Sequence, residues 1–172
     1  NPNDDDLYGK QLLRAKLNAQ YLASLHGFEP DSPFAQDKEM QARSKITLFR
    51  LLSKAKDEPM AAMEMFQKLK QNLTGPDLLH AEGSIMGAQR SVGSANIAQT
   101  VFNSVYDENG KQVMSLTDAE KAVRSKAAEF SPNDNMLANN AVRTLQTLNT
   151  RRFQAEKVDD WQLGQQVREI IQ

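Results

Sequence analysis

The apolar residues of the chain recur mainly at helical spacing. The first run consists of Leu13, Leu17, Tyr21 and Leu25, with Leu12 and Leu22 widening it. Residues spaced by three or four positions share one face of an α-helix, and a bundle helix normally turns such a face towards its core. We therefore predict a helix from about Leu7, with Gly27 following it as the C′ residue.

Later runs of the same kind predict the other helices. They lie at about 33–56, 59–73, 118–130, 132–148 and 155–171, and their apolar positions are Ile46, Phe49 and Leu52; Met63, Phe66, Leu69 and Leu73; Ala119, Val123, Ala127 and Phe130; Leu137, Ala141, Leu145 and Leu148; and Leu163, Val167 and Ile170 or Ile171. Two of these helices have a clear start, because Ser32-Pro33 and Ser131-Pro132 each supply an N-cap serine followed by a proline at N1.

The segment 76–106 carries a weaker helical signal. Its apolar positions include Ile97, Val101 and Val105. Gly83, Gly87 and Gly93 each cost about 1 kcal/mol relative to alanine inside a helix. We therefore expect a break within 83–94, in the form of a loop or kink. Whether the three glycines serve as a hinge, an interface or a plain loop stays open at this point.

The connection before the predicted helix at 118–130 carries two turn signals. Asn109-Gly110 suits a tight turn with positive φ at both central positions, and it lies between short apolar runs, which predicts a hairpin-like turn at 105–114. Thr117 and Glu120 match the capping-box pattern, in which the Thr hydroxyl caps the helix and the Glu carboxylate reaches back. The sequence thus predicts an all-α bundle of about six helices.

Composition supports one helical domain over residues 1–172, with residues 1–6 frayed. The chain has 172 residues, of which 40% are hydrophobic and 6% aromatic, and its net charge is −1. This balance provides no field for nucleic acid, and no apolar run approaches the roughly 20 residues of a membrane span. The absence of cysteine excludes disulfides and fits a reducing compartment, so we expect a cytoplasmic protein.

Two groups of residues are candidates for binding a protein partner. Met60, Met63 and Met65 could form an adaptable docking surface or could fill the core. Tyr106 and Trp161 could anchor a partner or could lie in the core or at its rim. A basic run on the second helix, made of Arg43, Lys45, Arg50, Lys54 and Lys56, predicts a solvated face or a contact with an acidic partner.

No motif for catalysis is found. His26 and His80 are the only histidines, and neither lies in a metal-binding spacing. No serine lies in a nucleophile motif, although two acidic residues could still converge in space. We therefore expect no metal, no cofactor and no enzymatic activity.

Residues 98–148 contain an apolar helix, a turn, a short apolar segment, a helix start and a Ser-x-Ala-Ala element. This order resembles the C-terminal part of bacteriophage tail assembly chaperones. The matching positions are Val105, Asp107, Glu108, Asn109, Gly110, Lys111, Ser115, Asp118, Ala119, Glu120, Ser125, Ala127 and Ala128. The resemblance implies a non-enzymatic protein of a bacterial host's cytoplasm that holds an aggregation-prone tail component during virion assembly.

A second functional class remains open. The chain could be a structural or ejected virion protein, or a secreted bacterial effector domain, that forms homo-oligomers through its helices. A chaperone would bind a partner helix transiently, whereas a virion component would assemble on its own. Both classes act through protein–protein contacts.

Overall fold

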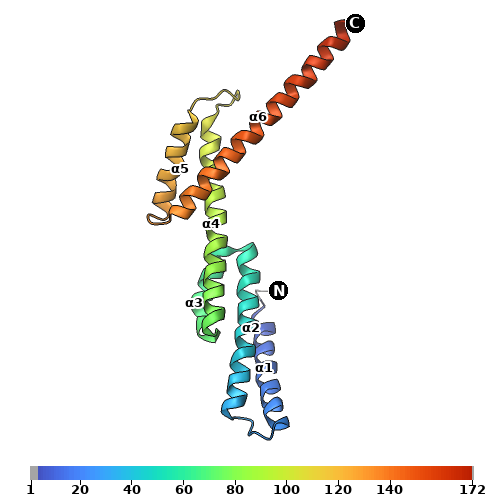
Figure 1. The fold of residues 1–172 in the computed structure, drawn as a ribbon, viewed down its shortest axis with the longest axis vertical. Coiled ribbons are helices and arrows are strands. Elements are labelled where there is room, and N and C mark those ends of the chain that lie inside the picture. Colours follow the sequence, from blue (N-terminus) through green and yellow to red (C-terminus); the bar gives the residue numbers. More distant parts are fainter. Residues whose placement is uncertain (1–3, 172) are drawn as a thin grey trace. The chain divides into compact units, whose positions relative to one another are not determined.

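The computed structural model describes residues 4–171, and for Glu156, Asp159, Asp160 and residues 162–171 it describes the backbone alone. Its helices are α1 (Asp5–Leu25), α2 (Pro33–Asp57), α3 (Pro59–Leu69), α4 (Gly75–Val105), α5 (Leu116–Phe130) and α6 (Asn135–Ile171), with a 3-10 turn η1 (Lys70–Asn72) after α3 (Figure 1). The predicted all-α class with about six helices is confirmed over the described residues, which include no strand.

The described chain groups into two compact units, one up to Gln89 and one from Arg90 onward. The sequence predicts a single domain instead. Helix α4 supplies residues to both units and is continuous through Gly83, Gly87 and Gly93, so the predicted helix break within 83–94 is not observed. Each unit has its own buried core, described separately below.

The core of the first unit lies among α2, α3 and the first half of α4. Its buried residues are Leu48, Leu51, Ala55, Ala62, Phe66, Leu73, Ala81 and Ile85. The predicted face of α2 is wrong by about one position, because Phe49 is 75% exposed while its neighbour Leu48 is buried. Helix α1 lies alongside α2 (Figure 1), and its buried residues are Ala15, Ala19 and Ala23.

Both ends of α1 have well-defined caps. The Asp4 carboxylate accepts a hydrogen bond from the Leu7 amide at 2.8 Å, so α1 already begins at Asp5 and residues 4–6 do not fray. At the other end Gly27 has φ +75, and the Phe28 amide donates to the Ala23 carbonyl at 2.9 Å. This is the Schellman geometry, which confirms the predicted C′ role of Gly27.

The core of the second unit lies among the second half of α4, α5 and the first part of α6. Its buried residues are Ile97, Ala98, Val101, Val105, Ala119, Val123, Ala127, Leu137, Ala141, Val142 and Leu145. Phe130, predicted on the apolar face of α5, is 60% exposed. Helix α6 continues to Ile171 without a second start at 155, and the side chains of the predicted face at Leu163, Val167, Ile170 and Ile171 lie outside the described residues.

The predicted starts of α5 and α6 are both corrected by the cap geometry. Helix α5 begins after Ser115, whose hydroxyl accepts from the Asp118 amide at 3.1 Å, so Thr117 lies in the first turn and is not the cap. The side chain of Glu120 contacts α6, where it accepts from Gln146 Nε2 at 2.7 Å. Helix α6 begins after Asp134, whereas Ser131 is the C-cap of α5.

The predicted hairpin-like turn is present, with a different turn geometry. The Asp107 carbonyl accepts from the Gly110 amide at 2.9 Å, which makes Glu108 and Asn109 the central residues. Gly110 alone of these has positive φ, at +78, so the prediction of positive φ at Asn109 is wrong. Tyr106 and Gln112 form an antiparallel bridge across the turn. A type I turn followed by a left-handed glycine explains this arrangement.

Candidate protein-binding surface

The leucine and tyrosine stripe of α1 points away from the core of its own unit. Leu13 is 58% exposed, Leu17 54%, Tyr21 65% and Leu25 63%. Leu22, beside them, is 41% exposed. The prediction that this stripe faces the core is therefore wrong. We call these five residues the outer face of α1.

Alanines explain why the stripe is left outside. Ala15, Ala19 and Ala23 also recur every four residues, and they are 6%, 3% and 0% exposed. At about 100° per residue, Leu17 and Tyr21 each lie roughly 160° around the helix from Ala19. Because alanines allow close helix packing, they fill the contact within the unit, and the larger side chains of α1 face the solvent.

Charges along α1 and the following loop are divided into two halves. Residues 7–16 carry Lys10, Arg14 and Lys16 and no acidic residue. Residues 17–32 carry Glu29 and Asp31 and no lysine or arginine. The outer face therefore runs from a basic half to an acidic half.

The three predicted methionines do not form one exposed surface. Met60 is 62% exposed. Met63 and Met65 are half-buried and pack against the core of the first unit. Met63 and Met65 therefore fill the rim of the core, and Met60 alone of the three is available to a partner.

Tyr106 serves as an internal anchor of the second unit. Its hydroxyl donates to Asn149 Oδ1 at 2.6 Å, and the Arg152 guanidinium lies 3.7 Å from its ring centroid. Arg152 also donates to the Gly110 carbonyl at 2.9 Å, so α6 holds the turn in place. By contrast, Trp161 on α6 is 66% exposed, which is compatible with its predicted anchoring role.

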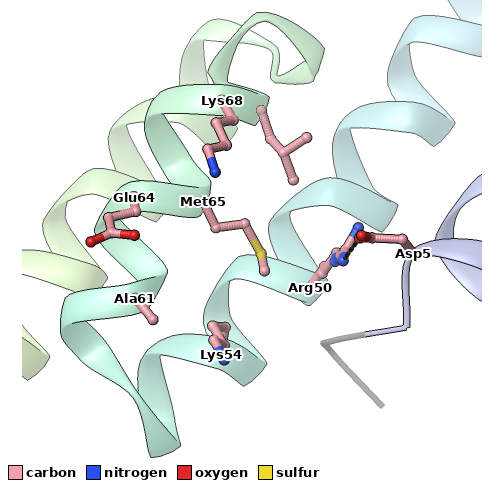
Figure 2. Close-up of a pocket in the computed structure, with 8 residues that line it drawn as sticks. Asp5, Arg50, Lys54, Ala61, Glu64, Met65 and Lys68 are labelled. Carbon is pink, nitrogen blue, oxygen red and sulfur yellow. Dashed lines mark hydrogen bonds and ion pairs between the residues drawn. The ribbon is translucent and has the colours of Figure 1, made fainter.

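A cleft of about 340 Å³ opens between α2, α3 and the start of α1. Figure 2 shows Met65 with its sulfur in this cleft and Arg50 beside Asp5. Arg50 and Lys54 are only 8% and 7% exposed, Arg50 pairs with Asp5, and Lys54 pairs with Glu58 at 2.7 Å.

These ion pairs change the interpretation of the basic run on α2. Lys45 pairs with Asp77 at 2.7 Å, and Arg43 pairs with Glu39 at 3.3 Å. Four of its five cations thus have acidic partners within the first unit. The prediction of a solvated basic face or an acidic partner is wrong for the buried Arg50 and Lys54.

A buried polar network joins α2 to the start of α4. The Ser44 hydroxyl donates to Asp77 Oδ2 at 2.6 Å and accepts from the Thr74 amide at 2.8 Å. Hydrogen bonds from Lys45 and Ser44 hold the pKa of Asp77 below its ordinary value of 3.8. A carboxylate with a lowered pKa is a weak base, so it is poorly suited to activate Ser44 as a nucleophile.

Two further aspartates have lowered pKa values for local reasons. The hydrogen bond from Arg90 is the main cause for Asp134, whose pKa is also lowered by the backbone amide of Leu137. The Ser115 hydroxyl is the main cause of the lowered pKa of Asp118. Both aspartates lie at helix starts, so these pKa shifts reflect capping.

The described residues contain no group of three or more acidic or histidine side chains that could hold a metal ion. Both histidines, His26 and His80, are exposed. Among the helices searched, none has the length and apolar character of a membrane span. The outer face of α1 is therefore the surface feature that most needs a binding partner.

No family model matches the chain, and neither a curated protein nor a solved structure matches it.

Proposed function

We propose that this chain is a non-enzymatic protein that works by binding other protein chains through the outer face of α1. The observation that carries the proposal is the exposure of five large apolar side chains along one helix. Contiguous apolar patches of this kind mark interaction sites on folded proteins.

The energetics of burial support this proposal. The five side chains of the outer face are each 41–65% exposed. Burying the remainder would stabilise a complex by roughly 1 kcal/mol for each side chain, or about 5 kcal/mol in all before the costs of association. A complex of moderate affinity follows if a partner provides a complementary apolar face.

The resemblance of residues 98–148 to tail assembly chaperones suggests the first partner to test. In that form of the proposal, the outer face binds an apolar segment of a phage tail component in a bacterial cytoplasm and keeps it from aggregating. The structural or ejected virion class is the alternative, and in that class the same face would join copies of this chain.

Affinity capture with a matched control tests the proposal. The tagged chain is compared with the double variant Leu17→Glu/Tyr21→Glu and with Leu79→Glu, a change at a leucine of α4 that is 68% exposed and outside the outer face. Lysates from cells that produce a phage tail component, and the untagged chain itself, serve as sources of partners.

We expect the wild type and the Leu79 variant to capture the same proteins and the double variant to lose them. Solubility of a co-produced tail component then distinguishes a chaperone from a structural protein. Equal capture by all three forms would contradict a binding role for the outer face.

A further inference from the structure

We infer that the outer face of α1 binds the same face of a second copy of this chain, with the two α1 helices antiparallel. This inference rests on the proposed function and names the partner. It draws on three observations: the apolar area left exposed, the arrangement of that area along the helix, and the division of charge between its two halves.

The exposed area is close to what a stable dimer needs. A side chain of this size offers about 150–200 Å² when fully exposed, so five half-exposed ones provide roughly 500 Å² per copy. A standard interface buries about 800 Å² per partner, and the stems of flanking Arg14, Lys16 and Gln20 would supply part of the remainder.

The spacing of the apolar residues fits a two-fold axis beside Ala19. An antiparallel pair centred there places Leu13 opposite Leu25 of the second copy and Leu17 opposite its Tyr21. Large apolar side chains then meet along the whole seam. The two-fold symmetry makes the contact isologous, as in most homodimers.

Charge selects the same register. An axis beside Ala19 places residues 7–16, the basic half, opposite residues 22–31 of the second copy, which belong to the acidic half. Lys10 then lies close to Glu29 of the other chain. A parallel pair would place the cations of one copy beside those of the other, which costs energy.

A partner of another chemistry fits these charges less well. An anionic membrane surface would attract Lys10, Arg14 and Lys16, but it would repel Glu29 and Asp31 at one end of the helix and Asp4–Asp6 at the other. A second copy satisfies both halves of the face at once.

Sedimentation velocity on the full 172-residue chain over a range of concentrations tests the pairing. We expect a wild-type dimer that dissociates on dilution. Leu17→Glu should raise the dissociation constant about 100-fold or more, because it places a charge in the seam of both copies. Leu79→Glu should leave the dimer unchanged. Circular dichroism confirms that each variant is folded.

A charge exchange tests the antiparallel register. Lys10→Glu alone and Glu29→Lys alone should each weaken the dimer roughly threefold, since each places like charges together. The double variant, which restores opposite charges, should return to the wild-type dissociation constant. A double variant weaker than either single one would overturn the register.

A wild type that is monomeric at all concentrations, or a dimer that Leu17→Glu leaves intact, overturns the pairing. If that monomer still captures another protein through Leu17, the proposed function stands while the self-pairing fails. If capture is also independent of Leu17, both fail.

Discussion

Helices α1 and α5 follow the same apolar rule and end in opposite environments. In α5 the residues Ala119, Val123 and Ala127 recur every four positions and are 0–1% exposed. In α1 the stripe of leucines and tyrosine has the same spacing, yet Leu17 and Tyr21 are more than half exposed. Periodicity identifies residues that share a face, but it does not say what covers that face.

The difference arises because α1 is apolar on two sides. Its alanines lie roughly opposite its large side chains, so the helix can bury only one set against α2. In α5, by comparison, the small and branched apolar residues share one face, and α4 and α6 cover it. A helix with two apolar faces has one to spare, which we assign to binding.

The largest expected effect compares one charge in each helix. Val123→Glu should destabilise the chain by about 4 kcal/mol or more, because it buries an unpaired carboxylate in the core of the second unit. Leu17→Glu should cost less than about 1 kcal/mol, since residue 17 is exposed and glutamate is a good helix former.

Denaturant unfolding at protein concentrations low enough for the monomer measures both. Glutamate at Ala119, which is 0% exposed, is a second probe of the α5 face and should behave like Val123→Glu. A Leu17→Glu variant as unstable as the α5 variants would mean that the outer face of α1 is covered within a single chain.

The second prediction compares the left-handed glycines of the two regions. Gly27, after α1, has φ +75 and open space where a Cβ would lie, whereas a Cβ on Gly110, before α5, would come 2.8 Å from Arg152 Nη2. Gly27→Ala should cost about 1 kcal/mol for the backbone strain alone. Gly110→Ala should cost about 2–3 kcal/mol, because Arg152 must also leave its carbonyl acceptor.

Thermal unfolding of the two variants, each against wild type, measures this difference. Arg152→Ala combined with Gly110→Ala is the matched control. The Gly110 change should cost less in that background, because the clash is already removed. Equal costs in both backgrounds would contradict a role for Arg152 in holding the turn.

The sequence predicted most of the helices, because strong periodicity and local caps determine them. Ser32 and Gly27 have their predicted capping roles, as their hydrogen bonds are made within a few residues of the chain. The start of α5 was misplaced by two residues, because Ser115 and Thr117 offer similar hydroxyl caps with an acidic residue three positions later. Helix α4 passes through its glycines because tertiary burial outweighs their low propensity.

The candidate surface was harder to predict than the fold. Choosing between the alanine and leucine faces of α1 depends on how closely α2 approaches, which is a tertiary property. The same limit applies to Tyr106, whose partners Asn149 and Arg152 lie more than 40 residues away. One signal was nevertheless present, since Ala15, Ala19 and Ala23 repeat as regularly as the leucines.

The third prediction concerns pH and shows where the two regions are alike. The pKa values of Asp77 in the first unit and Asp134 in the second are both lowered, mainly by hydrogen bonds from Lys45 and Arg90. A carboxyl whose folded pKa is depressed contributes stability above its ordinary pKa of 3.8, and this is lost as pH falls through the lower folded value.

Asp77→Asn and Asp134→Asn should each cost about 1–2 kcal/mol near pH 7, since each removes a charged hydrogen-bond acceptor. The cost should shrink as the pH falls below 3.8, where the wild-type carboxyl becomes protonated. Urea unfolding at a series of pH values, with Asp37→Asn on the exposed side of α2 as the control, measures this. A cost independent of pH would mean that packing, not charge, makes the aspartates matter.

The smallest effects compare the two halves of α4. A Cβ on Gly83 or Gly87 meets nothing within 4 Å, whereas one on Gly93 would lie 3.3 Å from Leu137 Cδ1. Gly83→Ala and Gly87→Ala should therefore each stabilise the chain by up to about 1 kcal/mol through helix propensity. Gly93→Ala should change stability little, because Leu137 must give way and offsets the gain. If Gly83→Ala or Gly87→Ala destabilised the chain in denaturant unfolding, that face of α4 would have to be covered by something that a single copy does not contain.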